Sequence, residues 1–129
     1  RNAAATCWSN FKQYFAKNGL GYCYDLKDVV AYYQLYKDLM EFYQSQYSDR
    51  FYNLDYEKLT TDQENQTREL IKYLELDWED TCLSPQDNSR SVRTASQQQV
   101  RQKVYKGSSE AWRKYEPFLN GAFGGLPSL

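Results

Sequence analysis

Histidine is absent from the 129 residues of this chain, and cysteine is scarce. The lack of histidine excludes Ser-His-Asp and Cys-His nucleophilic catalysis, histidine-ligated zinc and imidazole proton transfer from this segment. The three cysteines, Cys7, Cys23 and Cys82, are odd in number and form no CxxC pair. We therefore expect free thiols, a reducing and so cytoplasmic compartment, and no metal site.

Long apolar runs are also missing. No stretch approaches the roughly 20 apolar residues that a membrane span requires, and no signal-peptide pattern is present. We expect no membrane segment in this chain. It begins at Arg1 rather than at a methionine, which predicts that it is part of a longer protein.

Charge is unevenly distributed around a formal net charge of −1. Residues 25–80 carry 14 acidic and 6 basic side chains, whereas residues 90–114 carry seven basic side chains and one acidic side chain, Glu110. A basic stretch inside an acidic chain favours a local anion site. It does not favour a nucleic-acid surface, which usually makes a whole domain basic.

Helical periodicity dominates the first half. Residues 2–17 predict a helix that ends at Asn18-Gly19, and Asp25 is placed to cap the clearest helix of the chain. The apolar positions of that second helix recur at steps of three and four, which predicts a core-facing stripe. These positions are Leu26, Val29, Val30, Tyr33, Tyr36, Met40, Tyr43 and Tyr47.

The remaining elements are shorter. FYNLDYEKL (51–59) predicts a strand, and the capping box Thr61-Asp62-Gln63-Glu64 predicts a helix to about Leu76 with Leu70, Ile71 and Leu74 inward. Residues 85–108 predict an ordered loop or broken helix, followed by a short helix that starts near Ser108 or Ser109 and stops before Pro117. The fold class expected is mainly α with one or two short strands. A lone strand must pair with a preceding part of the protein or with another copy.

The polar stretch NSRSVRTASQQQVRQKVYKGSSEAWRKY combines arginines, lysines and hydroxyls just before a predicted helix start. Proteins use these side chains, together with the amides at a helix start, to bind phosphate or sulfate. Composition alone leaves a solvated basic loop as the alternative.

The string VRTASQQQVRQKVY, followed by Trp112 and Tyr115, resembles the C-terminal signature of sulfotransferases that use 3′-phosphoadenosine 5′-phosphosulfate (PAPS), especially bacterial ones. CLSPQDN and the YE.L element at Tyr56-Glu57-Lys58-Leu59 are similar to further family elements. Arg1 and Ser9 have the spacing of the family's R-[DN]-P-x-D-x-x-x-S element, although its Pro and Asp are Ala3 and Ala5 here.

This resemblance implies that residues 1–129 are the C-terminal half of an α/β, P-loop-like sulfotransferase domain. By it, Arg1 and Ser9 hold the 3′-phosphate of the nucleotide and Tyr56 helps to place adenine. The basic loop closes over the nucleotide through Arg93, Ser96 and Arg101. Lys106 is a further candidate, because Lys106-Gly107 and Trp112 have the spacing of an R-K-G-x-x-G-x-W element, whose arginine is replaced by Tyr105.

The same resemblance implies PAPS as cosubstrate, an acceptor hydroxyl and no metal. The family's 5′-phosphosulfate loop and catalytic base are not found in this sequence, so we expect half of a nucleotide site and no complete active site. A different class of function stays open, a non-catalytic, Tyr-rich helical interaction module. Either reading allows a homodimer through exposed apolar surface or a strand edge.

Overall fold

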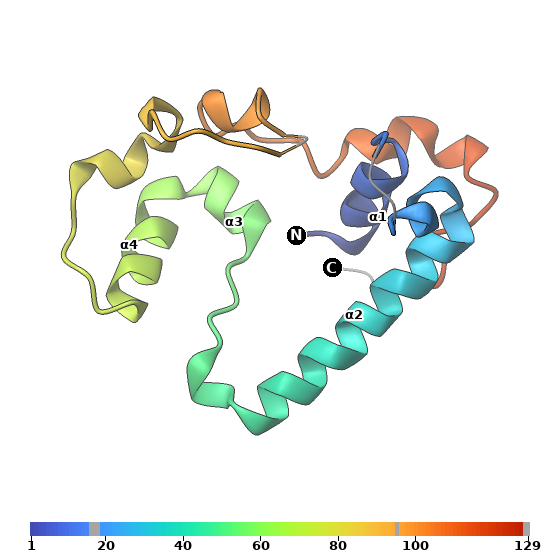
Figure 1. Cartoon of the computed structure of the whole chain (residues 1–129), viewed down its shortest axis with the longest axis horizontal. Coiled ribbons are helices and arrows are strands. Elements are labelled where there is room, and N and C mark those ends of the chain that lie inside the picture. The colour runs from blue at the N-terminus through green and yellow to red at the C-terminus, as the bar shows by residue number, and fades with distance from the viewer. Residues whose placement is uncertain (16–18, 95, 128–129) are drawn as a thin grey trace. The chain divides into compact units, whose positions relative to one another are not determined.

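The computed structural model describes residues 1–15, 19–94 and 96–127, and over these residues the chain is mainly helical (Figure 1). It divides into two compact units, which are described separately. Unit 1 comprises residues 1–51 and 107–129, and unit 2 comprises residues 52–106. The described residues contain no β-strand, so the expected mainly α class is confirmed and the expected short strands are not found.

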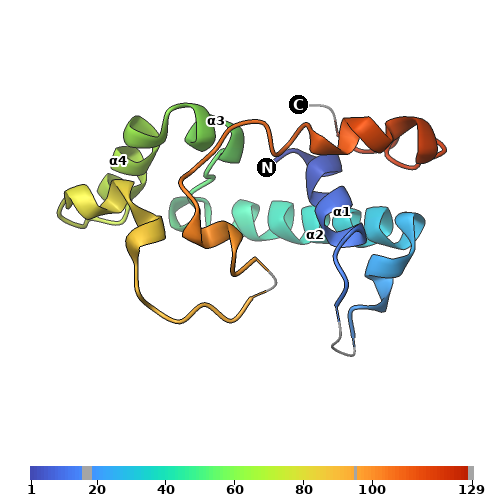
Figure 2. The same cartoon turned by 90° about the horizontal axis from the view of Figure 1, so that it is seen from above.

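Unit 1 is built on helix α1 (Ala3–Phe11), which packs against helix α2 (Leu26–Gln46) (Figures 1 and 2). Asn2 caps α1 by accepting a 3.0 Å hydrogen bond from the Ala5 amide. The buried residues of α1 are small: Ala3, Ala4, Ala5 and Cys7. Small side chains let the α1 backbone approach its neighbours closely. The helix ends at Phe11, earlier than the expected residue 17, and residues 16–18 lie outside the described residues.

Helix α2 begins where its sequence predicts. The Asp25 carboxylate accepts hydrogen bonds from the amides of Lys27 (2.7 Å) and Asp28 (3.3 Å), which confirms the predicted cap. A short 3₁₀ helix, η1 (Gly21–Tyr24), precedes it and places Cys23 in the interior.

The predicted core stripe of α2 is only half correct. Val29 is buried, and Leu26, Val30 and Tyr33 pack partly buried against the core. Beyond that point the stripe leaves the core, because Tyr36, Tyr43 and Tyr47 are 51%, 41% and 49% exposed. Periodicity identifies an apolar face, but it does not say how far along a helix the rest of the chain covers that face. A 3₁₀ helix, η2 (Ser48–Arg50), follows α2.

The core of unit 1 is completed by its C-terminal segment. Helix η6 (Ala111–Phe118) is a 3₁₀ helix that contacts α1 and buries Trp112, and the residues after it bury Leu119 and Phe123. The last helix begins at Ala111, two or three residues after the predicted start near Ser108 or Ser109, and the prediction that it stops before Pro117 was wrong. Pro117 lies inside η6, where the proline ring interrupts regular α-helical hydrogen bonding and is compatible with a tighter turn.

In unit 2, the strand predicted over residues 51–59 is not formed. Residues 51–55 have no regular secondary structure, and helix α3 (Tyr56–Thr61) begins after them. The Asp55 carboxylate caps α3 by accepting a 3.0 Å hydrogen bond from the Lys58 amide. With no neighbouring strand among the described residues to pair with, local capping decides the conformation of this segment.

Helix α4 (Gln63–Tyr73) follows, but the predicted capping box does not form. The Thr61 hydroxyl donates to the carbonyls of Glu57 and Lys58 within α3, and Glu64 pairs with Arg68 instead. Leu70 and Ile71 are half-buried, whereas Leu74 is exposed, so the inward face is shorter than expected.

Residues 85–108 are an ordered, mostly irregular segment, as expected. It contains two short 3₁₀ helices, η4 (Pro85–Asp87) and η5 (Gln99–Arg101), which pack against each other, and η3 (Asp80–Leu83) lies just before it. Ala95 lies outside the described residues. No helix within the described parts of the chain is long and apolar enough to cross a membrane.

We predict that only one of the three cysteines reacts readily with a thiol reagent in the folded chain. Cys7 and Cys23 are fully buried and Cys82 is half-buried. Desolvation raises the pKa of the Cys7 thiol to about 11, so its reactive thiolate is scarce at pH 8. Titration with a chromogenic disulfide should show one fast thiol per chain, and three after denaturation. Three fast thiols in the folded chain would contradict this core.

Candidate phosphate-binding residues

Arg1 lies at the start of α1, next to the Asn2 cap, and is exposed. Its guanidinium Nη2 donates a hydrogen bond to the Ser108 carbonyl at 3.4 Å. Residues 107 positions apart therefore meet in unit 1. The N-terminus of α1 adds the partial positive charge of its first amides to the charge of the arginine.

The segment that Arg1 reaches is a tight turn. Gly107 has a φ of +87°, a backbone conformation that favours glycine, and its carbonyl accepts from the Glu110 amide at 3.1 Å. Ser108 is half-buried and Ser109 is buried. The turn thus places the Ser108 backbone carbonyl beside the Arg1 guanidinium.

Ser9 is half-buried on the last turns of α1. Ser9 is seven positions after Asn2, a rise of about 10 Å along the helix. An arginine side chain that starts before the helix must therefore run alongside α1 to share one ligand with Ser9. The structure instead directs the Arg1 guanidinium to Ser108.

The aromatic residues of the C-terminal signature anchor this region. Tyr115 stacks on Trp8 of α1 with ring centroids 4.5 Å apart, and Trp112 meets Phe123 edge-on at 5.7 Å. The Arg113 guanidinium lies 5.1 Å from the Trp112 ring centroid and forms an ion pair with Glu110. Sequence reasoning recognised Trp112 and Tyr115 as matches to the signature but missed this packing role. Their spacing of three, which places both on one side of a short helix, was the available signal.

The Trp112 indole Nε1 is a buried donor that makes no hydrogen bond among the described residues. A buried donor without a hydrogen bond lowers the stability of the fold, and such groups are rare in native proteins. Trp112 is four residues from the turn that Arg1 contacts.

The other predicted contacts form a second group in unit 2. The Arg101 guanidinium donates to the Arg90 carbonyl at 2.5 Å, which closes residues 90–101 into a loop. The Val100 amide donates to the Ser96 carbonyl at 3.1 Å and begins the turn that leads into η5. Arg93 and Ser96 lie on this loop, and both are exposed.

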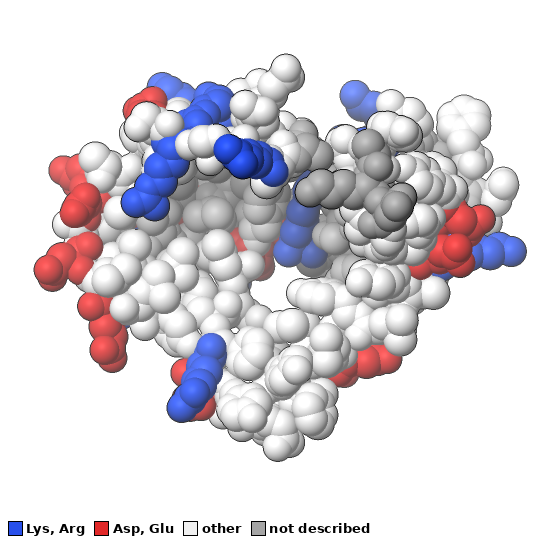
Figure 3. Space-filling view, viewed as in Figure 1, with Lys and Arg blue, Asp and Glu red and all other residues white. Residues whose placement is uncertain are grey.

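Positive charge is concentrated on this part of unit 2. In Figure 3 the blue atoms gather over the segment that Figure 1 draws in yellow to orange, and red atoms mark the edge near α4. Residues 88–109 contain five basic and no acidic side chains. Within the parts of the chain that the structure describes, none of these five has a carboxylate at ion-pairing distance. The basic side chains are Arg90, Arg93, Arg101, Lys103 and Lys106.

Tyr56 is the first residue of α3 and is half-buried, and Lys106 is exposed at the end of unit 2, covalently joined to Gly107. Tyr56, Arg93, Ser96, Arg101 and Lys106 thus belong to unit 2, whereas Arg1 and Ser9 belong to unit 1. The structure brings Arg1 to the turn after Lys106-Gly107 and Arg101 to Arg90.

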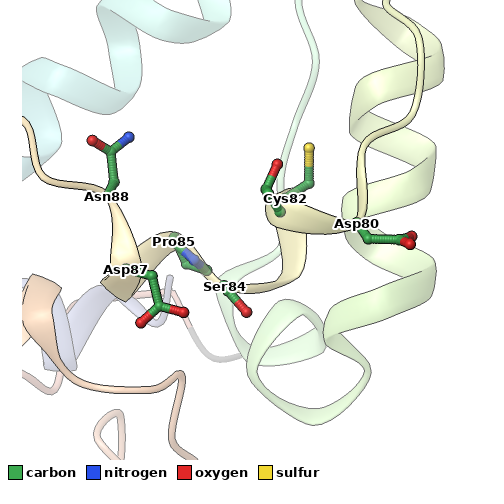
Figure 4. A pocket seen from close by; sticks show the side chains of 7 residues that line it. Asp80, Cys82, Ser84, Pro85, Asp87 and Asn88 are labelled. Atoms are coloured by element: carbon green, nitrogen blue, oxygen red, sulfur yellow. The ribbon is translucent and has the colours of Figure 1, made fainter.

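A cavity of about 690 Å³ lies in the CLSPQDN stretch of unit 2 (Figure 4). The side chains around it include the Asp80 and Asp87 carboxylates, the Ser84 hydroxyl and the Cys82 thiol. Two carboxylates repel a phosphate group, so this cavity does not suit the anionic part of a nucleotide. Over the described residues, no group of three or more Cys, Asp or Glu is arranged to hold a metal ion.

Comparison with known proteins identifies the family. A family profile described as "Sulfotransferase family" matches residues 1–80, which is more than half of the chain. The chain belongs to the sulfotransferase family. The matched sulfotransferase region includes Arg1, Ser9 and Tyr56, whereas Arg93, Ser96, Arg101 and Lys106 lie beyond it.

An uncharacterized protein of Aquifex aeolicus (strain VF5) is 38% identical to this sulfotransferase-family chain over 121 residues. The similarity covers 92% of the chain but only 16% of the relative, so the chain spans about a sixth of that protein's length. No solved structure matches the chain.

Arg1→Ala and Asn2→Ala should differ sharply in their effect on the free energy of unfolding. Asn2 is buried and caps α1, so its loss should lower this free energy by about 1–2 kcal/mol. Arg1 is exposed and its contact is long, so its loss should lower it by less than about 0.5 kcal/mol. Urea denaturation of the two variants measures both values. Equal losses would mean that Arg1 stabilises the fold, which would contradict its assignment to ligand binding.

Proposed function

We propose that this chain is the C-terminal half of a PAPS-dependent sulfotransferase domain and supplies the 3′-phosphate and adenine side of the nucleotide site. The observation that carries the proposal is the hydrogen bond from Arg1 to Ser108. It joins the two stretches, one at each end of the chain, whose residues resemble 3′-phosphate-binding elements.

The chemistry of the residues supports an anionic ligand. A phosphate monoester carries close to two negative charges and accepts several hydrogen bonds. Arg1 provides positive charge and hydrogen-bond donors at the N-terminus of α1, beside the turn at Ser108. Ser9 lies farther along the same helix.

The basic loop of unit 2 supports the same proposal. Arg93 and Ser96 are exposed on a loop whose ends the Arg101–Arg90 hydrogen bond holds together. A closed loop loses less conformational entropy when a ligand orders it, which favours binding. We assign Arg93, Ser96 and Arg101 to nucleotide binding, Lys106 to the 3′-phosphate and Tyr56 to the base.

In the reaction that we propose for the intact enzyme, an acceptor hydroxyl oxygen attacks the sulfur of PAPS. The new S–O bond forms as the bond from sulfur to the 5′-phosphate oxygen breaks, and the hydroxyl proton passes to a base. Like phosphoryl transfer, this reaction depends on positioning the reactants and stabilising negative charge on the leaving oxygen. This chain fixes the far end of the nucleotide, and we assign the 5′-phosphosulfate loop and the base to the preceding half of the domain.

A helical interaction module is the second candidate function. It is favoured by a specific observation, the large apolar side chains that the C-terminal half of α2 exposes.

Binding of 3′-phosphoadenosine 5′-phosphate (PAP), the desulfated product, tests the proposal. Arg1→Ala and Arg101→Ala should each weaken PAP binding at least about tenfold, because each removes a charge-assisted hydrogen bond of about 1.5–3 kcal/mol. Isothermal titration calorimetry at fixed salt measures this change. Arg50→Ala is the matched control, since Arg50 is an exposed arginine in η2 that is not among the assigned residues.

Comparison with adenosine 5′-phosphate makes the test specific for the 3′-phosphate. The unaltered chain should prefer PAP, and Arg1→Ala should abolish most of that preference while leaving binding of adenosine 5′-phosphate nearly unchanged. If Arg1→Ala and Arg101→Ala behave like Arg50→Ala, the assignment of these residues is wrong.

A further inference from the structure

Helix α2 has a second apolar face that the core of unit 1 does not use. Its side chains recur at intervals of three and four from the second turn to the end of the helix, and they are 41–65% exposed. We call this face the α2 seam: Tyr32, Leu35, Tyr36, Leu39, Phe42 and Tyr43. In a heptad written abcdefg the six residues occupy a, d and e in two successive heptads, the pattern of a helix that packs against another helix.

The seam lies beside the core-facing side of α2. Leu26, Val30 and Tyr33 occupy other heptad positions and contact the core of unit 1, whereas the buried Val29 shares position e with the exposed Tyr36 and Tyr43 farther along the helix. The core of unit 1 covers only the core-facing side of α2. The core of unit 1 therefore leaves the seam available for a different contact.

Charged side chains are excluded from the seam. The three charged residues between Tyr32 and Tyr43 lie outside it, and each has a partner on α2 itself. Lys37 pairs with Glu41 at 3.4 Å, and the Asp38 carboxylate accepts from the Gln34 amide at 2.8 Å. A second apolar surface can therefore approach the seam without burying an unpaired charge.

Several seam rings are held in place before any partner binds. Tyr32 stacks on Tyr22 with centroids 4.0 Å apart, Tyr36 contacts Tyr33 at 5.8 Å, and Phe42 meets Tyr43 edge-on at 5.6 Å. Rings that are already ordered lose little side-chain entropy on association. Tyrosine is also enriched at protein interfaces, because its ring is apolar and its hydroxyl tolerates water when the interface is open.

We propose that the α2 seam joins two copies of this chain in a two-fold symmetric dimer. The six side chains expose roughly 100 Å² each, about 600 Å² per copy and about 1,200 Å² for the pair, which is at the lower end of the range of stable interfaces. The seam is self-complementary, since it is apolar, bears no charge and repeats every seven residues. This interface uses none of the residues assigned to the nucleotide.

Light scattering coupled to size exclusion tests the dimer on the full 129-residue chain. At micromolar concentrations it should elute with twice the 15.3 kDa mass of one chain and dissociate on dilution. A mass of one chain at several hundred micromolar, or soluble aggregates without a fixed mass, would overturn the proposal.

The double variant Leu35→Gln with Leu39→Gln places two polar amides in the middle of the seam. It should raise the dissociation constant of the dimer at least about 30-fold, because both leucines would be buried at its centre. Both positions are exposed in the single chain and glutamine is a good helix former, so circular dichroism should show unchanged helix content. Glu41→Gln introduces the same residue outside the seam and should leave the dimer intact. A dimer that persists in the double variant forms elsewhere and contradicts the assignment.

Discussion

The packing of α1 against α2 and η6 is the contact on which the rest of unit 1 depends. The alanines at positions 3–5 are buried, and with Cys7 they let α1 approach Val29 and Trp112 closely enough to form one core. The start of α1 is fixed by the buried Asn2 cap, and Arg1 is adjacent to that cap. The ring stack of Trp8 on Tyr115 fixes η6 against the same helix. The contact between Arg1 and Ser108 follows from this arrangement, because the core holds both ends of the chain in place. The position of the candidate site residue Arg1 is thus a consequence of core packing.

In unit 2, acidic and basic residues are separated along the chain. The acidic residues lie mostly before position 88, where Asp80 and Asp87 line a cavity that repels anions. The basic residues follow it in a loop without a single carboxylate, so their charges are not neutralised locally. Separation of this kind raises the potential of one surface while the chain stays nearly neutral overall, which suits a local anionic ligand better than a long nucleic acid.

The sequence predicts local features of this fold better than tertiary ones. The Asp25 cap, the helix α2 and the irregular basic segment were all predictable, because each depends on neighbouring residues. The strand at residues 51–59 was predicted from side-chain propensity, but a strand requires a partner, and Asp55 capped a helix instead. Thr61 failed as a cap because its hydroxyl bonded back to the preceding helix. Of the candidate site, the residue identities were predictable from the family resemblance and remain proposals. The contact of Arg1 with the Ser108 carbonyl was not predictable, since no side-chain pattern marks a backbone acceptor 107 residues away.

The distribution of tyrosine explains how one helix can carry both a core face and an open face. A seam of leucine and phenylalanine alone would favour aggregation whenever it was uncovered, because all of its surface would be apolar. In the α2 seam three of the six side chains are tyrosines, whose hydroxyls keep hydrogen bonds with water while the rings remain exposed. The rings can therefore be exposed to water in the single chain, and the proposed dimer would remove these rings and the leucines from water. The 13 tyrosines and the low mean hydropathy of −0.87 are consistent with a surface of this type, in which apolar area is available for contact without making the chain as a whole hydrophobic.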